Sequence, residues 1–393
     1  MKTFEFKLYH HKRNKYLHRR IDVSSEIYNH CIALHRRYYR LCGKYLNKYQ
    51  LQKHITKLKR RQCYEHWNLV GSQAIQDITD RIERGYQLFF DSLKKRLSKL
   101  TSGNGKHKRV GPPGFKKRKK YRSFTLKQAG YALLGDNNVR IHDRVYRYHK
   151  SREIEGCIKT LTVKRDTLGD IYFCFSCEVE KDQTNRVMTG KSAGFDFGLK
   201  TYLTGDDGTD DVIEEISSLF FKQGIKEIKK VNRELSRKQK GSNNWTRAKL
   251  NLARLHKRIA NQRQDYHYST GRKLVKKYDA VFFENLHLKS MQMMWGKKIS
   301  DLGFGDFLKI LECIAAKNGV IFGKIDRFYP SSKECSECHE INHDLRLKDR
   351  EWNCPVCKAH HDREKNAAKN IHRVGASTYG VGSVRPPCAA TPV

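Results

Sequence analysis

The first hundred residues show two different spacings of hydrophobic side chains, one after the other. Near the N-terminus, apolar side chains occupy every second position, at Phe4, Phe6 and Leu8. This alternation is typical of a strand, and we expect residues 1–20 to be strand-like. From Ser24 onward apolar residues recur at steps of three and four, and a second run of this kind follows further along. The sequence therefore predicts a helical domain of roughly 80 residues after the first segment.

Residues 102–122 interrupt these repeats with a basic linker. The segment carries four glycines, two prolines and nine Lys or Arg side chains. Glycine and proline interrupt regular structure, and clustered positive charge can neutralise phosphates. We predict a linker that binds nucleic-acid backbone, with a purely solvated connection as the alternative. The side chains expected to make these contacts are Lys116, Lys117, Arg118, Lys119 and Lys120.

Alternation returns between residues 123 and 179 and predicts a group of short strands. Cys174 and Cys177 lie three residues apart in this region. Residues three apart on a strand point to opposite faces, so these two thiols cannot share a ligand. We interpret both as ordinary buried or half-buried cysteines.

Residues 222–277 combine a narrow apolar stripe with strong positive charge. They hold 18 Lys or Arg against three acidic side chains, a net charge of +15. A break at residues 241–244 (GSNN) predicts two antiparallel helices, each about 30 Å long. We predict that this hairpin contacts nucleic acid, the alternative being a solvated hairpin. The expected contact residues are Lys226, Lys229, Lys230, Arg254, Lys257 and Arg258.

Charge and composition narrow the class of protein. Of 393 residues, 80 are Lys or Arg and 41 are Asp or Glu, giving a formal net charge of +39. An excess of this size indicates a polyanionic partner such as nucleic acid. No apolar run approaches the ~20 residues of a membrane span, and the first 20 residues lack the apolar core of a secretory signal. These features argue against an integral membrane protein.

Four of the twelve cysteines form a metal-ligand pattern. Cys335 and Cys338 are followed, after fifteen residues, by Cys354 and Cys357, which is the spacing of a four-cysteine zinc site. Four thiolates complete the coordination shell, so the predicted zinc is structural. The other cysteines show no disulfide framework, which favours a reducing, cytoplasmic location, at the nucleoid if the source is prokaryotic. We expect the nearby histidines to be neighbours rather than ligands: His339, His360 and His361.

Three acidic residues occupy positions where acids are unusual. Asp196 lies in a short strand, Glu284 ends an apolar run that reads as a buried strand, and Asp362 opens a helix after the second cysteine pair. A carboxylate in an apolar strand is costly unless it is paired or metal-bound. The three acids could converge on Mg²⁺, which prefers oxygen ligands. From spacing alone, each is as well explained by a structural ion pair.

The sequence resembles a known family in five segments. They are residues 194–199 (GFDFGL), 283–286 (FENL), 328–338 (FYPSSKECSEC), 350–357 (REWNCPVC) and 361–368 (HDREKNAA). Together they resemble the TnpB family, which comprises transposon-encoded RNA-guided DNA endonucleases related to the type V CRISPR effectors. The resemblance is strongest in the second half of the chain and weaker, though continuous, in the first.

The resemblance implies an α+β multidomain protein with a RuvC-like RNase H fold, in which Asp196, Glu284 and Asp362 are catalytic and hold two Mg²⁺ ions. It also implies a guide RNA made from the transposon end, with one protein per RNA. The target would be double-stranded DNA, cut beside a short adjacent motif. The implied parts are a wedge-like β-barrel (1–20 and 115–188), a helical recognition domain (21–105), a basic linker (106–122), a nuclease domain (189–330 and 359–376), an inserted zinc ribbon (331–358) and a flexible tail (377–393).

The sequence leaves two candidates for the third acid. On a helical wheel, Glu364 shares the stripe of Ala367, Ala368 and Ile371, which favours Glu364 facing the interior. Asp362, however, occupies the predicted N-cap, where wheel angles do not apply, and it matches the motif of the family. We therefore assign Asp362 as the metal ligand and Glu364 as its neighbour.

Two other functions are compatible with the same residues. One is a DNA transposase that uses the same three acids to join DNA ends. The other is a zinc-ribbon regulator that binds nucleic acid without catalysis.

Overall fold

The computed structural model describes residues 1–9, 14–102, 110–127, 129–179, 186, 188–198, 201–209, 213–216, 220–288, 290–291, 293, 296, 301–346 and 348–381. The chain divides into two units, Met1–Lys181 and Asp182–Val393, and each is described by itself. Parts of the predicted linker (residues 106–109) and tail (382–393) lie outside the described residues.

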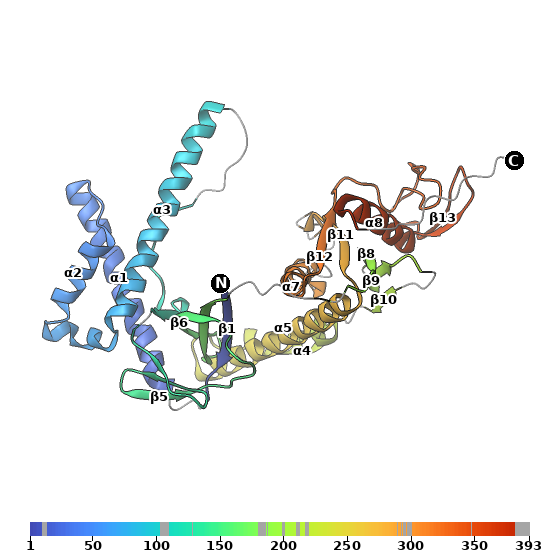
Figure 1. Ribbon diagram of the computed structural model, residues 1–393. Helices are drawn as coiled ribbons and strands as arrows, with labels where there is room; N and C mark the ends of the chain where they lie inside the picture. The colour runs from blue at the N-terminus through green and yellow to red at the C-terminus, as the bar shows by residue number, and fades with distance from the viewer. Residues whose placement is uncertain are drawn as a thin grey trace. The chain divides into compact units, whose positions relative to one another are not determined.

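The first unit joins a group of helices to two antiparallel sheets (Figure 1). One sheet has the order β1-β7-β6-β2 and the other the order β3-β4-β5. The helical elements are α1 (Lys15–Cys42), α2 (Lys48–Leu58), the 3-10 segments η2 (Gln62–Leu69) and η3 (Arg118–Lys120), and α3 (Ser72–Ser102). The strands are β1 (Lys2–Lys7), β2 (Ser123–Leu126), β3 (Ala132–Leu133), β4 (Asn138–Ile141), β5 (Arg144–Arg147), β6 (Cys157–Arg165) and β7 (Ile171–Glu178).

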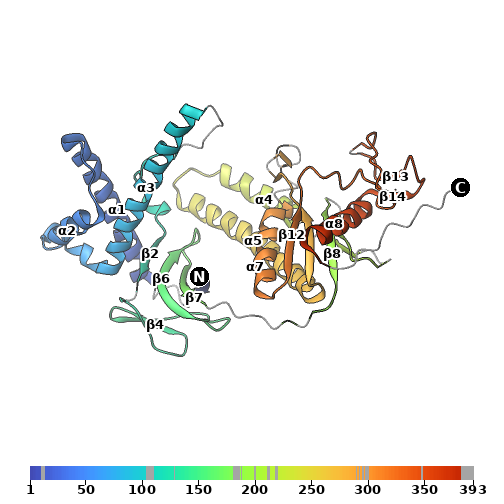
Figure 2. The same cartoon turned by 45° about the horizontal axis from the view of Figure 1, so that its top comes forward.

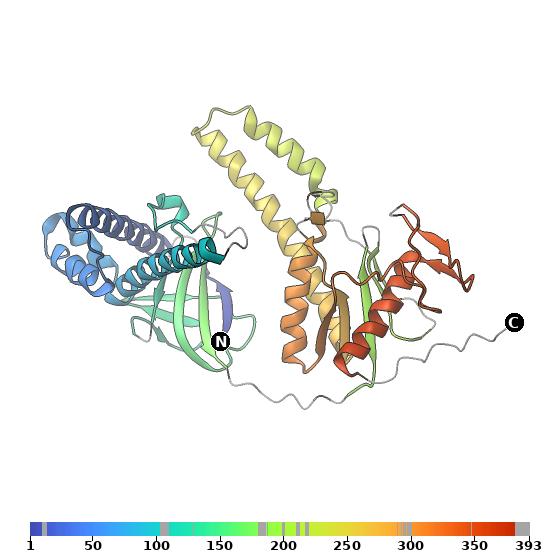
Figure 3. The same cartoon turned by 90° about the horizontal axis from the view of Figure 1, so that it is seen from above.

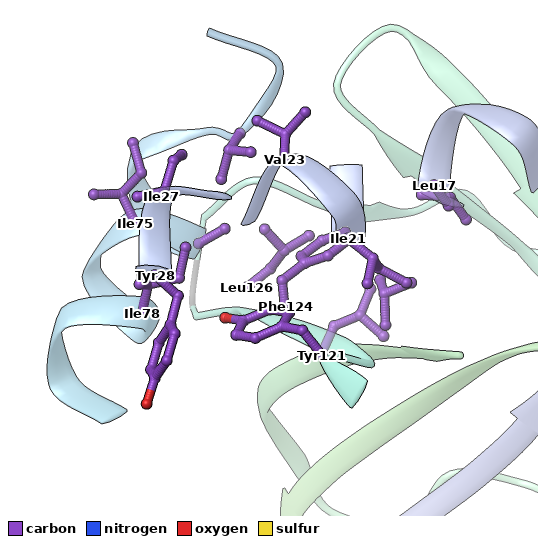
Figure 4. Packing of buried hydrophobic residues seen from close by; sticks show 14 of the residues in the cluster. Leu17, Ile21, Val23, Ile27, Tyr28, Ile75, Ile78, Tyr121, Phe124 and Leu126 are labelled. Atoms are coloured by element: carbon purple, nitrogen blue, oxygen red, sulfur yellow. The ribbon is translucent and has the colours of Figure 1, made fainter. Parts of the chain in front are cut away.

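One hydrophobic core connects the helices of this unit to its larger sheet. Ile21 and Ile27 of α1 pack with Ile78 of α3 and with Phe124 and Leu126 of β2 (Figure 4). The apolar stripes of α1 and α3 therefore face one side of the sheet, as the three- and four-residue steps predict.

One sequence prediction about the N-terminal region is corrected and another is not confirmed. The strand ends at Lys7 and α1 already begins at Lys15, because Leu17 and Ile21 extend the buried helical stripe backward from Ser24. In addition, neither strand order closes on itself within the described residues, so the predicted wedge-like β-barrel is not confirmed. The prediction for Cys174 and Cys177 is confirmed, since both are buried in β7.

The second unit is built on a mixed five-stranded sheet of order β10-β9-β8-β11-β12. In this sheet β8, β11 and β12 are parallel, and β9 runs antiparallel to β8 and β10. Its strands are β8 (Ser192–Phe197), β9 (Thr201–Asp206), β10 (Ile213–Ile216), β11 (Ala280–Glu284) and β12 (Ile321–Ile325), with a small pair β13 (Glu351–Asn353) and β14 (His360–Asp362). The helices are α4 (Phe220–Ser236), α5 (Asn243–Lys277), α7 (Phe304–Lys317) and α8 (Arg363–Tyr379).

Helices cover both faces of the mixed sheet (Figure 2). Val281 and Phe283 of β11 pack with α5 and α7, whereas Phe282 between them packs with α8. A central strand buried on both faces reads as a continuous apolar run, which explains why no polar residue interrupts residues 280–283.

The predicted basic hairpin is confirmed as two packed helices, α4 and α5 (Figure 3). The second helix is longer than expected, with 35 residues, or about 52 Å. Its C-terminal part continues into the core through Leu274 and Val275. Among the described residues, no helix is both long and apolar enough to cross a membrane.

Candidate metal sites and nucleic-acid surfaces

Two acidic side chains meet at neighbouring ends of parallel strands. Asp196 lies near the end of β8, and Glu284 is the last residue of β11. The register pairs Phe195 with Phe283, so each acid is the next residue in its strand. Because successive side chains alternate and both phenylalanines pack toward α5 and α7, both carboxylates point to the face covered by α8.

Burial and like charge disfavour the ionised forms of the acids on this face. Burial raises the pKa of Asp196 well above its usual range, and the carboxylates of Glu284 and Glu364 raise it further. The N–H of Phe197 donates to Asp196 Oδ1 over 2.8 Å and acts in the opposite direction. Burial also raises the pKa of Glu284, although the Ser331 hydroxyl donates to its Oε1.

The third acid that acts on Asp196 is Glu364, from the first turn of α8. Its Oε2 lies 3.2 Å from the position of a Cβ on Gly198, just after β8. Its Oε1 accepts from Arg350 Nη1 over 2.7 Å. Asp362 instead caps the helix, because its Oδ1 accepts the N–H groups of Glu364 and Lys365, each over 3.0 Å.

The predicted N-cap role of Asp362 is therefore confirmed, whereas its role as a metal ligand stays a prediction. The carboxylates of Glu284 and Glu364 both act electrostatically on Asp196, but among the described residues only the four cysteines form a group whose ligand atoms all lie within 4.8 Å of one another. Acids that repel one another suit a divalent cation with oxygen ligands, because such an ion would relieve the repulsion. Arg363, whose charge favours the ionised forms of Asp196 and Glu284, supplies only part of that relief.

The four predicted zinc cysteines form one cluster. The sulfur atoms of Cys335, Cys338, Cys354 and Cys357 all lie within 4.8 Å of one another. Cys335 and Cys354 are buried, and the other two are exposed. Backbone N–H donors of Val356 and Cys357 lower the pKa of the Cys354 thiol to about 7, although its burial acts the other way. Four sulfur ligands at this separation fit a tetrahedral zinc site.

The two cysteine pairs have matching backbone geometry. In the first, the N–H of His339 donates to the carbonyl of Cys335; in the second, that of Lys358 donates to Cys354. His339 and Lys358 both have positive φ angles, 65° and 62°. Each pair is thus a tight knuckle closed by one left-handed residue, as the spacing predicts.

The nearby histidines are arranged as neighbours of the cysteines. His361 is buried and its Nε2 lies 3.0 Å from the sulfur of Cys335, while its ring packs against Trp352. His360 instead pairs through Nδ1 with Asn353. A hydrogen bond to a ligand sulfur is a typical outer-shell contact.

Sequence reasoning missed Arg350 and Ser331, which contact Glu364 and Glu284 respectively. Both lie inside the segments that carry the family resemblance. Their polar side chains within these segments are the signal that could have identified them.

The basic linker is partly docked on the first unit. The Lys116 ammonium lies 4.6 Å from the ring centre of Tyr28, and burial lowers its pKa. Arg118 forms an ion pair with Asp22 over 3.1 Å. All five predicted phosphate contacts of the linker are exposed: Lys116, Lys117, Arg118, Lys119 and Lys120.

The basic hairpin presents most of its predicted contact residues to solvent. Exposed residues are Lys226, Lys229, Lys230, Arg254 and Arg258, and Lys257 is half-buried. The Arg258 guanidinium pairs with Glu227 over 2.7 Å, which reduces the charge that it can offer to a phosphate.

A polar groove in the first unit was not predicted. It has a volume of about 560 Å³ and lies between α2, η2 and α3. Its walls combine amide, hydroxyl and basic side chains: Gln52, Thr56, Lys59, Arg60, Asn68, Ser72 and Gln76, together with Ile75.

Comparisons with known proteins match both halves of the second unit. A family model described as "Probable transposase" (OrfB_IS605) matches residues 174–294, and one described as "Cas12f1-like, TNB domain" matches residues 304–371. A putative RNA-guided DNA endonuclease of Streptomyces pristinaespiralis is 32% identical over 231 residues, which cover 58% of this chain and 56% of that protein. The chain thus spans little more than half of that relative.

Two longer matches extend over most of the chain. The putative RNA-guided DNA endonuclease InsQ of Escherichia coli K12 is 25% identical over 377 residues, covering 91% of this chain and 88% of InsQ. The structure of a Cas12f1–guide RNA–target DNA complex matches with a TM-score of 0.51 and 14% identity, covering 91% of this chain and 82% of that one.

The solved structure shows a similar fold, and the two family models match different parts of the chain. Together the comparisons confirm the resemblance to the TnpB family that the five sequence segments indicated.

Proposed function

We propose that this protein is an RNA-guided DNA endonuclease that hydrolyses phosphodiester bonds at the carboxylates of Asp196, Glu284 and Glu364. The observation that carries the proposal is the placement of Asp196 and Glu284 at neighbouring ends of parallel strands, on the face covered by α8, where Glu364 of that helix acts on Asp196. The names of the curated relatives support the same activity.

The proposed chemistry is metal-assisted hydrolysis. One or two bound Mg²⁺ ions would supply a Lewis acid and an activated water. The chain's own residues hold the metal: Asp196 and Glu284 from adjacent strands and Glu364 from α8. Ser331 orients Glu284 through its hydroxyl, and Arg350 stands beside Glu364, where a guanidinium can also contact a phosphate of the substrate.

We further propose a RuvC-like RNase H fold for the second unit and a structural zinc ribbon at residues 331–358. The mixed sheet, with its acids on β8 and β11 and with α8 across one face, supports the nuclease fold. The four sulfur atoms leave no open ligand position, which supports a structural and not a hydrolytic ion.

Guide RNA and double-stranded target DNA are the proposed partners. The net charge of +39 supports a polyanion, and the exposed lysines of α4 offer a surface for its phosphates. Lys229→Gln should weaken RNA binding and lower the salt slope by about one. Arg258→Gln is the matched control with a smaller expected change, because Glu227 already neutralises that guanidinium.

The groove of the first unit is a candidate for contacts with bases. Side-chain amides such as Gln76 can pair with a base edge, and Lys59 and Arg60 can hold the adjoining phosphates. We propose that this groove contributes to reading a short motif in the target.

Purification of the protein together with RNA made from its own flanking DNA tests the proposal. The expected result is a copurifying RNA and Mg²⁺-dependent cleavage of a matched DNA target. DNA joining without RNA would instead support a transposase, the activity that the description of one matching family model favours. Nucleic-acid binding without any cleavage would support a regulator.

A further inference from the structure

A buried chain of hydrogen bonds ties α8 to two strands of the mixed sheet. The Ser192 hydroxyl lies 2.8 Å from His372 Nε2, and His372 Nδ1 lies 2.8 Å from Asp206 Oδ2. Ser192 begins β8, Asp206 ends β9, and His372 lies on α8. Ser192 is 9% exposed and His372 is 7% exposed. The proposed metal chemistry uses none of these three side chains.

The serine–histidine–aspartate order does not by itself indicate a hydrolase. Ser192 faces the backbone of a packed helix and is closed to a substrate. Asp206 accepts from Nδ1–H and so fixes the tautomer of His372, which leaves Nε2 to accept from the serine hydroxyl. Every polar atom of the imidazole is thereby satisfied, as a buried group requires.

The same faces of β8 and α8 carry the acids. Ser192, Gly194 and Asp196 alternate along one face of β8, and His372, Ala368 and Glu364 recur at four-residue steps along α8. Four residues of strand span about 13 Å, and eight residues of helix span about 12 Å. Two elements anchored at Ser192–His372 thus place Glu364 opposite Asp196.

The contact between strand β8 and helix α8 is unusually close. A Cβ on Gly194 would lie 2.2 Å from the backbone nitrogen of His372 and 2.7 Å from the carbonyl oxygen of Ala368. Small residues allow this approach, but a smooth contact of glycine and alanine specifies the rotation of a helix poorly. A fully satisfied buried polar network supplies such specificity.

We propose that Ser192, His372 and Asp206 are positioning residues that fix the rotation and axial position of α8, and so hold Glu364 against Asp196 for metal binding. This inference rests on the proposed metal site, and it deepens the proposed function. A helix turned by one residue would move Glu364 by about 100° around the axis and away from the strand.

The test measures Mn²⁺ affinity without nucleic acid, by the electron paramagnetic resonance of free Mn²⁺, on zinc-loaded protein. Asp196→Ala should abolish the Mn²⁺ site. Ser192→Ala and His372→Phe should lower the Mn²⁺ affinity of the same site by about 10-fold or more, as loss of an outer-shell partner does. Asp206→Asn keeps an oxygen that can accept from Nδ1–H and should stay within about twofold of the wild type. Leu311→Ala, in the core on the opposite face of the sheet, is the stability control: it should lower the melting temperature without changing the Mn²⁺ affinity.

Three affinity results would overturn the proposal. They are unchanged Mn²⁺ affinity in both Ser192→Ala and His372→Phe, an equal loss in Leu311→Ala, and no Mn²⁺ binding that depends on Asp196 in the wild type. Covalent labelling of Ser192 by a fluorophosphonate would also overturn it, because it would make the serine a reactive nucleophile. Wild-type protein that binds Mn²⁺ through Asp196 but never cuts DNA would refute the proposed function and leave this inference standing.

Discussion

The cysteine cluster and the carboxylate cluster lie in the same unit but are assembled in opposite ways. The cysteines come from two short knuckles within residues 335–357, and each knuckle is closed by its own backbone hydrogen bonds. The carboxylates come from β8, β11 and α8, which are far apart in the sequence. A site of the first kind depends on local turns, whereas a site of the second kind depends on how a helix packs against a sheet.

The two clusters also differ in what they do to the protein without metal. Burial raises the pKa values of Asp196 and Glu284, and acidic neighbours raise that of Asp196 further, so these acids oppose folding whenever they are ionised. At the knuckles, burial raises the pKa values of Cys335 and Cys338, whereas hydrogen bonds with backbone N–H groups and neighbouring thiols lower that of Cys354 to about 7 against its own burial. The comparison predicts that zinc removal damages the fold, while loss of an acid damages only the chemistry.

The largest expected effect is on cleavage. Asp196→Ala or Glu284→Ala should lower the single-turnover rate of Mg²⁺-dependent cleavage by more than about 100-fold, because each removes a ligand from the metal itself. RNA affinity and zinc content should stay at wild-type values, since both depend on other residues. Glu351→Gln, an exposed acid of β13, is the control. Normal cleavage by either alanine variant would refute the carboxylate site.

Removal of a zinc ligand should act on stability first. Cys335→Ser or Cys357→Ser should lose the single zinc ion per chain and lower the melting temperature, because metal binding to a structural site contributes folding free energy. Elemental analysis and thermal denaturation measure the two effects. The exposed Cys313 provides the matched control, and Cys313→Ser should keep both values. Freshly purified wild-type protein without zinc would contradict this prediction.

The same difference decides what the sequence could predict. The spacing of Cys335, Cys338, Cys354 and Cys357 was sufficient for the knuckles, and the apolar run that ends at Glu284 was sufficient for a buried strand. Both patterns are local. The basic hairpin was predicted for the same reason, although the length of α5 was not, because its C-terminal part is fixed by packing against α7.

Features that depend on tertiary contacts were missed. The docking of Lys116 on Tyr28 cannot be read from a run of positive charge. The start of α1 at Lys15 depends on Leu17 being buried by the sheet. For the third acid the sequence offered both candidates, Glu364 from the helical wheel and Asp362 from the family motif, and the structure adds that Glu364 acts on Asp196.

The two candidates for the third acid can be separated directly. Glu364→Gln should reduce cleavage nearly as much as Asp196→Ala, because Glu364 faces the other acids. Asp362→Asn should keep most of the activity and cost at most about 1 kcal/mol of stability, since asparagine is also a good N-cap. Cleavage rates at saturating Mg²⁺ and urea denaturation measure the two effects. Loss of activity only in Asp362→Asn would restore Asp362 as the ligand.

The smallest expected effect concerns how the folding stability of the protein depends on pH when no Mg²⁺ is bound. The pKa of Asp196 is raised in the folded state by burial and by its acidic neighbours. As the pH rises from about 4, the unfolded chain releases this proton before the folded chain does, so folding stability falls until the raised folded-state pKa is passed.

Asp196→Asn removes this ionisation while keeping the shape of the side chain. In EDTA-free buffer without divalent ions, the variant should therefore be more stable than the wild type at pH 8, and the difference should shrink toward pH 4. Each unit of pKa shift corresponds to about 1.4 kcal/mol. Saturating Mg²⁺ should reverse the order, because the ion stabilises only a chain that binds it. Thermal denaturation at pH 5 and pH 8, with and without Mg²⁺, measures the stability under all four conditions. If the wild type is the more stable protein at pH 8 without Mg²⁺, the acids are already neutralised by the protein, for example by Arg350 and Arg363.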